Sequence, residues 1–166
     1  TFKNVEREEM EHFEEHLATV NAEKKKETTD VTMDVEPTGA SIEELTDRNA
    51  EWRKELRASM KAKERTAIER IKMPELDPLY RATTRTEEVN IGLTKEMALT
   101  EAKRCLDCPK PTCMEGCPVS INIPSFIKNI ERGQFLAAAK VLKSTSALPA
   151  VCGRVCPQEK QCESKC

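Results

Sequence analysis

The stretch CLDCPKPTCMEGCPVSINIPSF, residues 105–126, places four cysteines within 13 residues and follows the last of them with proline. A second stretch, CGRVCPQEKQCESKC, residues 152–166, holds four more. We call residues 105–117 the first cysteine block and residues 152–166 the second. The 104 residues before the first block contain no cysteine. Eight thiols gathered in two short blocks indicate that this part of the sequence binds metal.

The composition argues against several classes of partner. The formal net charge of −2 gives no electrostatic reason to expect a nucleic acid. No apolar stretch approaches the roughly 18 residues that would cross a bilayer, so we expect no membrane partner. Residues 1–25 are acidic rather than signal-like, and the expected compartment is therefore the cytoplasm. In that compartment, clustered thiols bind metal more often than they form disulfides.

The cysteine spacing leaves three alternatives open. The two blocks read C-x2-C-x4-C-x3-C and C-x3-C-x5-C-x3-C. Two [4Fe–4S] clusters are favoured, because eight thiols supply four ligands to each and Cys117-Pro118 fits the pattern in which the cysteine before proline serves the other cluster. Zinc is the second alternative, although its sites usually present two C-x2-C pairs and only one occurs here. Disulfides or free thiols are the third.

The sequence before the cysteines predicts helices and no sheet. Mostly helical spacing of apolar residues predicts an amphipathic helix over 1–26, and residues 27–40 resemble a linker. Ser41 and Glu44 form a capping box that opens a helix expected to reach residue 72, two residues before a proline. Residues 73–85, with two prolines, are expected to be extended.

Three further helices are expected around the first cysteine block. Thr94 caps a helix that delivers Cys105 and Cys108 at its C-terminal end. A helix over 121–133 has proline near its first turn and ends at Gly133, and another follows over 134–144. The inward face of the last helix is expected to carry Phe135, Ala139 and Leu142. Apolar residues expected to shield the thiols are Phe126, Ile127, Ile130, Phe135 and Leu142. The predicted fold class is all-α.

Five stretches together resemble a known family. They are MPELDPLYR (73–81), EEVNIGLTKEMALTEA (87–102), EAKRCLDC (101–108), PTCMEGCPVSINIPSFIKNIERGQF (111–135) and SALPAVCGRVCPQEKQCESKC (146–166). They are similar to the N-terminal iron–sulfur domain of the glutamate synthase small subunit. The same domain occurs in NADPH-dependent glutamate synthase-like proteins, in the large subunit of NADH-dependent ferredoxin:NADP oxidoreductase, and in dihydropyrimidine dehydrogenase. The resemblance covers about residues 70–166.

The resemblance implies an α-helical ferredoxin-like domain with two [4Fe–4S] clusters. By analogy, the first cluster takes Cys105, Cys108, Cys113 and Cys166. The second takes Cys117, Cys156 and Cys162. In relatives its remaining corner is often a Gln or Glu beyond the last cysteine of the motif, and here Cys152 is the alternative. The expected organisation is a charged helix and linker over 1–40, an amphipathic helix leading in over 41–73, and the two-cluster domain over 74–166.

The implied function is electron transfer within a larger oxidoreductase. No glycine-rich nucleotide motif and no nucleophile with its base occurs in the sequence, so FAD and NADPH are expected in domains that follow in the intact protein. A glutamate synthase-like enzyme is the first expectation, with a large glutamate synthase subunit or a flavin reductase as possible partner. A bifurcating ferredoxin:NADP oxidoreductase and a zinc-stabilised interaction domain are the alternatives. Arg154, between Cys152 and Cys156, is the candidate cation for contact with a cluster.

Overall fold

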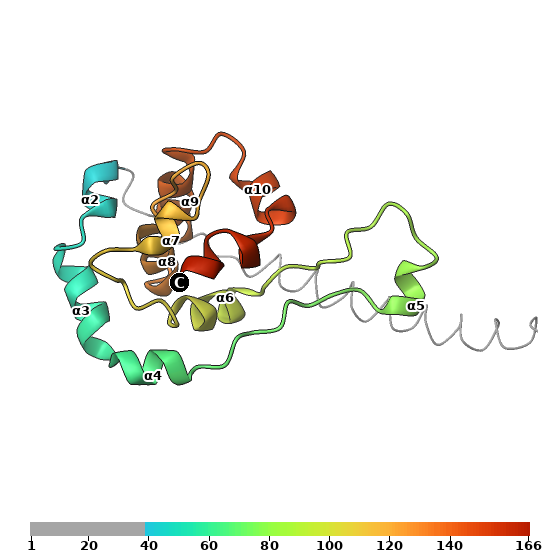
Figure 1. The fold of residues 1–166 in the computed structure, drawn as a ribbon, viewed down its shortest axis with the longest axis horizontal. Helices are drawn as coiled ribbons and strands as arrows, with labels where there is room; N and C mark the ends of the chain where they lie inside the picture. The colour runs from blue at the N-terminus through green and yellow to red at the C-terminus, as the bar shows by residue number, and fades with distance from the viewer. Residues whose placement is uncertain (1–38) are drawn as a thin grey trace, which may run out of the picture. The chain divides into compact units, whose positions relative to one another are not determined.

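The computed structural model describes residues 39–166, which belong to one compact unit (Figure 1). The helix predicted over 1–26 and most of the predicted linker lie outside the described residues. The helices that are described are α2 (Ile42–Thr46), α3 (Glu51–Ser59), α4 (Ala62–Ala67), α5 (Pro78–Arg81), α6 (Lys95–Ala102), α7 (Thr112–Glu115), α8 (Ile123–Glu131), α9 (Phe135–Lys143), α10 (Pro149–Val155), and the 3-10 turns η1 (Gln158–Lys160) and η2 (Glu163–Lys165). Within these residues there is no β-strand, which confirms the all-α prediction.

The single helix predicted over 41–72 is wrong, because the chain forms three short helices there. The capping box is present as predicted: Ser41 Oγ accepts the Glu44 N–H, and the Glu44 carboxylate accepts the Ser41 N–H. The first break follows α2, where the Asp47 carboxylate accepts the Asn49 N–H at 2.8 Å in a local turn. The second break lies at Met60, whose backbone is extended. None of these helices reaches residue 72.

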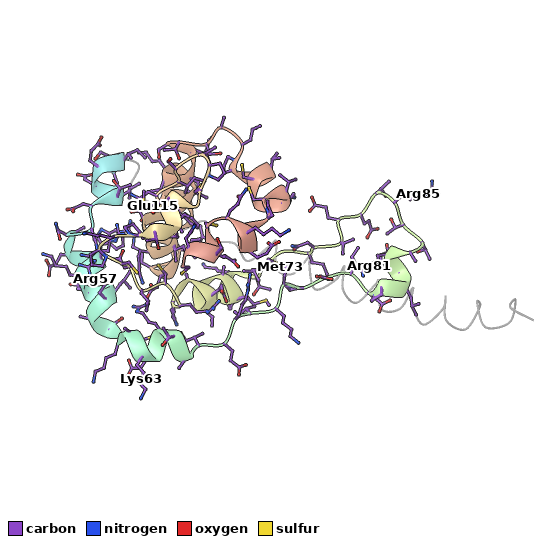
Figure 2. All side chains as sticks on the ribbon, viewed as in Figure 1. Arg57, Lys63, Met73, Arg81, Arg85 and Glu115 are labelled. Atoms are coloured by element: carbon purple, nitrogen blue, oxygen red, sulfur yellow. The ribbon has the colours of Figure 1, made fainter. Side chains whose placement is uncertain are left out.

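Residues 73–92 form an arm rather than a simply extended segment. Its two sides pair through one isolated antiparallel bridge between Glu75 and Asn90, and the Leu76 N–H donates to the Val89 carbonyl at 2.8 Å. Helix α5 lies within the arm, and Asp77 caps it by accepting two backbone N–H groups. Arg81 lies on this arm (Figure 2). The prediction that residues 73–85 are extended is therefore right on either side of α5 and wrong for α5 itself.

Helix α6 begins where the sequence predicted, after Thr94, whereas α8 begins at Ile123, later than the predicted start at residue 121. Thr94 Oγ1 accepts the Met97 N–H at the start of α6, and Asn122 Oδ1 accepts the Ser125 N–H at the start of α8. Gly133 has a φ of +82° and separates α8 from α9, as expected for a glycine stop. Helix α6 ends earlier than predicted, so Cys105 and Cys108 follow it in a loop.

The apolar core is small and lies where α2 contacts α8 and α9. Leu45 packs with Ala137 and Val141, and Val141 is completely buried. The predicted inward face of α9 is wrong at Ala139, which is exposed, because Ala137, Ala138 and Val141 form the buried stripe. The five residues expected to shield the thiols are all only half-buried. Among the helices of residues 39–166, none has the length and apolar character to cross a bilayer.

Candidate metal centre

The first cysteine block lies between α6 and α8. Cys105 and Cys108 lie in the loop after α6, and Cys113 lies on α7. Cys117 comes after Gly116, the residue that caps the end of α7. The loop is unusual at Asp107, between the first two cysteines, where φ is +52° and the side chain is buried. A non-glycine residue in this backbone region is uncommon and requires support from its surroundings.

The second cysteine block is built on α10 and the two 3-10 turns. Cys152 lies on α10, and Cys156 caps its C-terminal end by donating its N–H to the Cys152 carbonyl. Cys162 and Cys166 lie immediately before and after η2. A proline after Cys156 turns the chain away from α10, since proline cannot supply the N–H that would continue a helix.

The two blocks contact each other. Helix α7 packs against η2, and the Thr112 hydroxyl donates to the Lys165 carbonyl. Gly116 lies against the backbone of Gln161 and Cys162. Residues separated by about 50 positions in the sequence therefore meet, and thiols from both blocks can serve one site.

All eight thiols are free, and the thiols that influence one another's pKa fall into two groups of four. Burial raises the pKa of Cys113 to about 11, assisted by the charges of Cys166, Cys105 and Cys108. Burial also raises the pKa of Cys105, and the charge of Cys166 contributes. These electrostatic effects link four thiols to one another. We call them the first thiol set: Cys105, Cys108, Cys113 and Cys166.

The other four thiols form the second thiol set: Cys117, Cys152, Cys156 and Cys162. Burial raises the pKa of Cys156, and a charge and a hydrogen bond from Cys152 add to it, followed by the charges of Cys117 and Cys162. Burial likewise raises the pKa of Cys162, with a contribution from Cys117. Ser146 lies beside this set, because its buried Oγ is 3.9 Å from the sulfur of Cys152.

The donor chemistry of these sets fits iron–sulfur clusters. Four soft thiolates are the usual ligand set of a [4Fe–4S] cluster, and each set offers four. The pKa is raised for two thiols of each set, Cys105 and Cys113 in the first and Cys156 and Cys162 in the second. A metal that binds these thiols would displace their protons. Within residues 39–166, no three His, Cys, Asp or Glu side chains converge as the ligands of a single metal ion would.

Arg154, the predicted cluster contact, lies on the exposed side of α10. Its Nε donates to Glu88 at 2.6 Å and its Nη1 donates to the Ala150 carbonyl. Hydrogen bonds and the charge of Glu88 raise the pKa of Arg154 further. Its side chain is 60% exposed, so the ion pair joins the arm to α10 at the surface.

Two charged residues near the first thiol set were missed by the sequence reasoning. Asp107 and Lys128 are almost completely buried, and both contact the backbone or thiol of Cys105. The position of Asp107 between two cysteines was visible in the sequence. Its burial was not, because Asp and Lys are seldom buried unless they are paired.

Comparisons with known proteins agree with this picture. Residues 81–166, more than half of the chain, match the family described as dihydropyrimidine dehydrogenase domain II, 4Fe-4S cluster. The chain is 36% identical over 95 residues to the glutamate synthase [NADPH] small chain of Azospirillum brasilense, covering 57% of this chain and 20% of that protein. It is 40% identical over 80 residues to two Escherichia coli proteins, which covers 48% of this chain in each case. These are the NAD-dependent dihydropyrimidine dehydrogenase subunit PreT, of which 19% is covered, and the putative oxidoreductase UacF, of which 12% is covered.

The matches therefore span no more than a fifth of the length of these relatives. The family match, residues 81–166, contains both cysteine blocks. The chain belongs to the 4Fe-4S cluster family of dihydropyrimidine dehydrogenase domain II.

Proposed function

We propose that the two thiol sets hold two [4Fe–4S] clusters in an α-helical ferredoxin-like domain. The first thiol set would hold one cluster and the second thiol set the other. The grouping of eight free thiols into two sets of four is the observation that carries this proposal. The membership of Cys152 in the second set rests on its hydrogen bond and charge interaction with Cys156. The family match to a 4Fe-4S cluster domain supports the same cofactor.

The function that this arrangement supports is transfer of single electrons. When bound, such clusters accept and release one electron at a time. The chain's own residues would hold them, exclude water from them and set their potentials. Electrons would pass between a flavin, reduced by NADPH in other domains of the intact protein, and the acceptor centre of a partner. The names of the relatives, a glutamate synthase small chain and a dihydropyrimidine dehydrogenase subunit, support a place in such an oxidoreductase.

A glutamate synthase-like oxidoreductase is the enzyme we favour, and a bifurcating ferredoxin:NADP oxidoreductase is the alternative within the same chemistry. We further propose that residues 74–166 are the cluster domain, that residues 41–73 lead into it, and that the protein works in the cytoplasm without nucleic acid or membrane. Arg154 remains the proposed cation near the second thiol set. A zinc-stabilised interaction domain is the alternative from another class.

The first test is the metal content of the anaerobically purified chain. Two clusters predict about eight iron and eight acid-labile sulfide per chain and a brown absorbance that dithionite bleaches. Zinc without sulfide would refute the proposal and favour the interaction domain. About four iron and four sulfide would show that only one set binds a cluster, which contradicts the two-cluster proposal.

Three cysteine variants then assign the ligands. Cys113→Ser should remove the cluster of the first thiol set, and Cys156→Ser that of the second, each with loss of about half of the iron. The electron paramagnetic resonance signal that each variant retains identifies the other cluster. Cys152→Ser should behave like Cys156→Ser. If Cys152→Ser keeps all of its iron, Cys152 is not a ligand.

A further inference from the structure

The loop between Cys105 and Cys108 is held by the side chain of Asp107, whose carboxylate two arginines contact. Asp107 is 1% exposed and its carboxylate accepts three hydrogen bonds. Arg53 donates two of them, at 3.0 and 2.6 Å, and Arg57 donates the third at 2.6 Å. Burial alone would raise the pKa of Asp107, but the hydrogen bonds and charges of Arg53 and Arg57 outweigh it and lower the pKa. The carboxylate is therefore ionised and fully paired.

The backbone of the same residue is fixed as well. Arg48 donates to the Asp107 carbonyl at 3.0 and 3.3 Å. Arg53, itself 2% exposed, also donates to the Thr46 carbonyl and to Ser125 Oγ, which joins α3 to α8. These contacts hold Asp107 in its left-handed conformation, which costs on the order of 1–2 kcal/mol for a residue other than glycine.

A second buried group of charges fixes the chain just before Asp107. Lys128 on α8 is completely buried, donates to the Cys105 carbonyl at 2.8 Å and pairs with Glu131. Glu131 also pairs with Arg65 on α4 at 2.8 Å. Arg65 in turn donates to the Lys103 carbonyl at 2.7 Å. Three carbonyls, those of residues 103, 105 and 107, therefore accept hydrogen bonds from buried or half-buried cations.

The arginines of this network all precede residue 81, where the family match begins. Figure 2 shows one of them, Arg57, on α3. Burying several charges is costly, and it is tolerated only where each one has a partner. Nothing in the network is left without one, because no buried side-chain nitrogen or oxygen among the described residues lacks a hydrogen bond. Helices α3 and α4 are therefore tied to the first cysteine block through charge.

We propose that Arg48, Arg53, Arg57 and Asp107 form a positioning network that sets the conformation of the first cysteine block and the reduction potential of the cluster bound there. This inference rests on the proposed function, since it needs a cluster in the first thiol set. The inference assigns a role in electron transfer to three arginines that lie outside the matched family region. The residues act through the loop and through their charges rather than as ligands.

Two physical effects connect the network to the cluster. The first effect runs through the backbone of Asp107, which the three arginines fix two residues after Cys105. Hydrogen bonds from backbone N–H groups to ligand sulfurs favour the reduced state, so the conformation of this loop affects the potential. The second effect is the field of the buried charges, which water screens little at this depth. A cation near the cluster favours the added electron, and an anion opposes it.

The network's two signs of charge allow a sharp test. Arg57→Gln removes a cation and should lower the midpoint potential of the first-set cluster. Asp107→Asn removes an anion and should raise that potential. The double variant Arg57→Gln/Asp107→Asn restores the charge balance and should return the potential toward that of the unchanged protein. A merely structural role would shift the two single variants in the same direction.

Lys54→Gln is the matched control. Lys54 lies on the same helix, its side chain is 51% exposed, and it pairs with Glu51 at the surface. Lys54→Gln removes one positive charge, as Arg57→Gln does. Solvent screens the charge at this exposed position, so no shift in the midpoint potential is expected. The measurement is a redox titration followed by electron paramagnetic resonance on the full chain, with the first-set signal identified as the one lost in Cys113→Ser.

Opposite shifts in the first-set signal, with the second-set signal unmoved, would support the network's role. Shifts of the same sign in both single variants, or no shift in either, would overturn the network's role. The proposed function would still stand in that case, provided that the unchanged protein contains its clusters. Should Asp107→Asn fail to fold, Arg57→Gln decides alone, because its side chain is 23% exposed and its loss leaves Arg53 on the carboxylate. An unchanged protein without clusters would refute the proposed function itself.

Discussion

Gly116 lies so close to Gln161 that no side chain fits between them. A Cβ atom on Gly116 would lie 2.7 Å from the Gln161 carbonyl oxygen and 3.0 Å from the Cys162 Cα atom. Backbone atoms cannot move aside as the end of a flexible side chain can. Glycine at this position is therefore what lets the two cysteine blocks meet.

Gly116→Ala should separate the blocks beside Cys117 and Cys162. We expect a loss of stability of about 1–3 kcal/mol, as for overpacking in a tight contact. We also expect loss of iron from the second thiol set, measured as iron and sulfide per chain. Gly153→Ala is the control, because a Cβ there meets nothing within 4 Å and α10 should gain up to about 1 kcal/mol. Equal iron in both variants would contradict the close contact.

Leu45→Ala should destabilise the unit that contains the cluster domain. Leu45 on α2 is 4% exposed and packs with Val141 on α9. Removing its side chain should lower the free energy of unfolding by about 2–5 kcal/mol, measured by anaerobic denaturant titration. Leu79→Ala on the arm, where the side chain is 78% exposed, should change it by less than about 0.5 kcal/mol. Similar effects of the two variants would show that α2 does not pack as described.

Gly133→Ala should cost about 1–2 kcal/mol through backbone strain alone. The φ of +82° at this turn disfavours a side chain, although no atom lies within 4 Å of the added Cβ. Thermal unfolding of the variant should begin at a lower temperature. Gly39→Ala, which has neither a positive φ nor a close neighbour, should leave the transition unchanged. An unchanged transition in Gly133→Ala would mean that the turn relaxes freely.

Arg154→Gln should lower the midpoint potential of the second-set cluster. The change removes a cation from α10, which carries Cys152, although exposure to solvent limits the effect. Glu88→Gln breaks the same ion pair but leaves the cation in place, so its shift should have the opposite sign. Redox titration of both variants measures this. Shifts of the same sign would indicate that the ion pair matters only as a link between the arm and α10.

The helices with local signals were predictable from the sequence. Thr94 and Asn122 cap α6 and α8 through contacts only three residues long, and Gly133 ends the turn after α8 by its own backbone freedom. Such signals act within one turn of helix and need no knowledge of the rest of the chain. The grouping of cysteines into sets was implied by family resemblance rather than by spacing.

The wrong prediction of one helix over 41–72 has a physical cause, which is the pairing of charged side chains with residues far away in the sequence. The region 41–72 has the pattern of one amphipathic helix, but Arg53 and Arg65 point into the interior to carboxylates more than 50 residues away. In a sequence, charged residues are assigned to the solvent-exposed face of a helix. When such residues are buried, the face that was expected to be exposed is the one that packs against the interior. Helix breaks at Asp47 and Met60 accommodate that reversal.

The meeting of Cys166 with Cys105 and Cys113 has a consequence for synthesis of the protein. Ribosomes add about 5–20 residues per second, so three thiols of the first set emerge several seconds before the fourth is made. During that interval the earlier thiols are exposed to oxidants with their site incomplete, while all four members of the second set emerge before Cys166. Under the proposed function, the cluster of the first thiol set can be completed only after translation has passed Cys166.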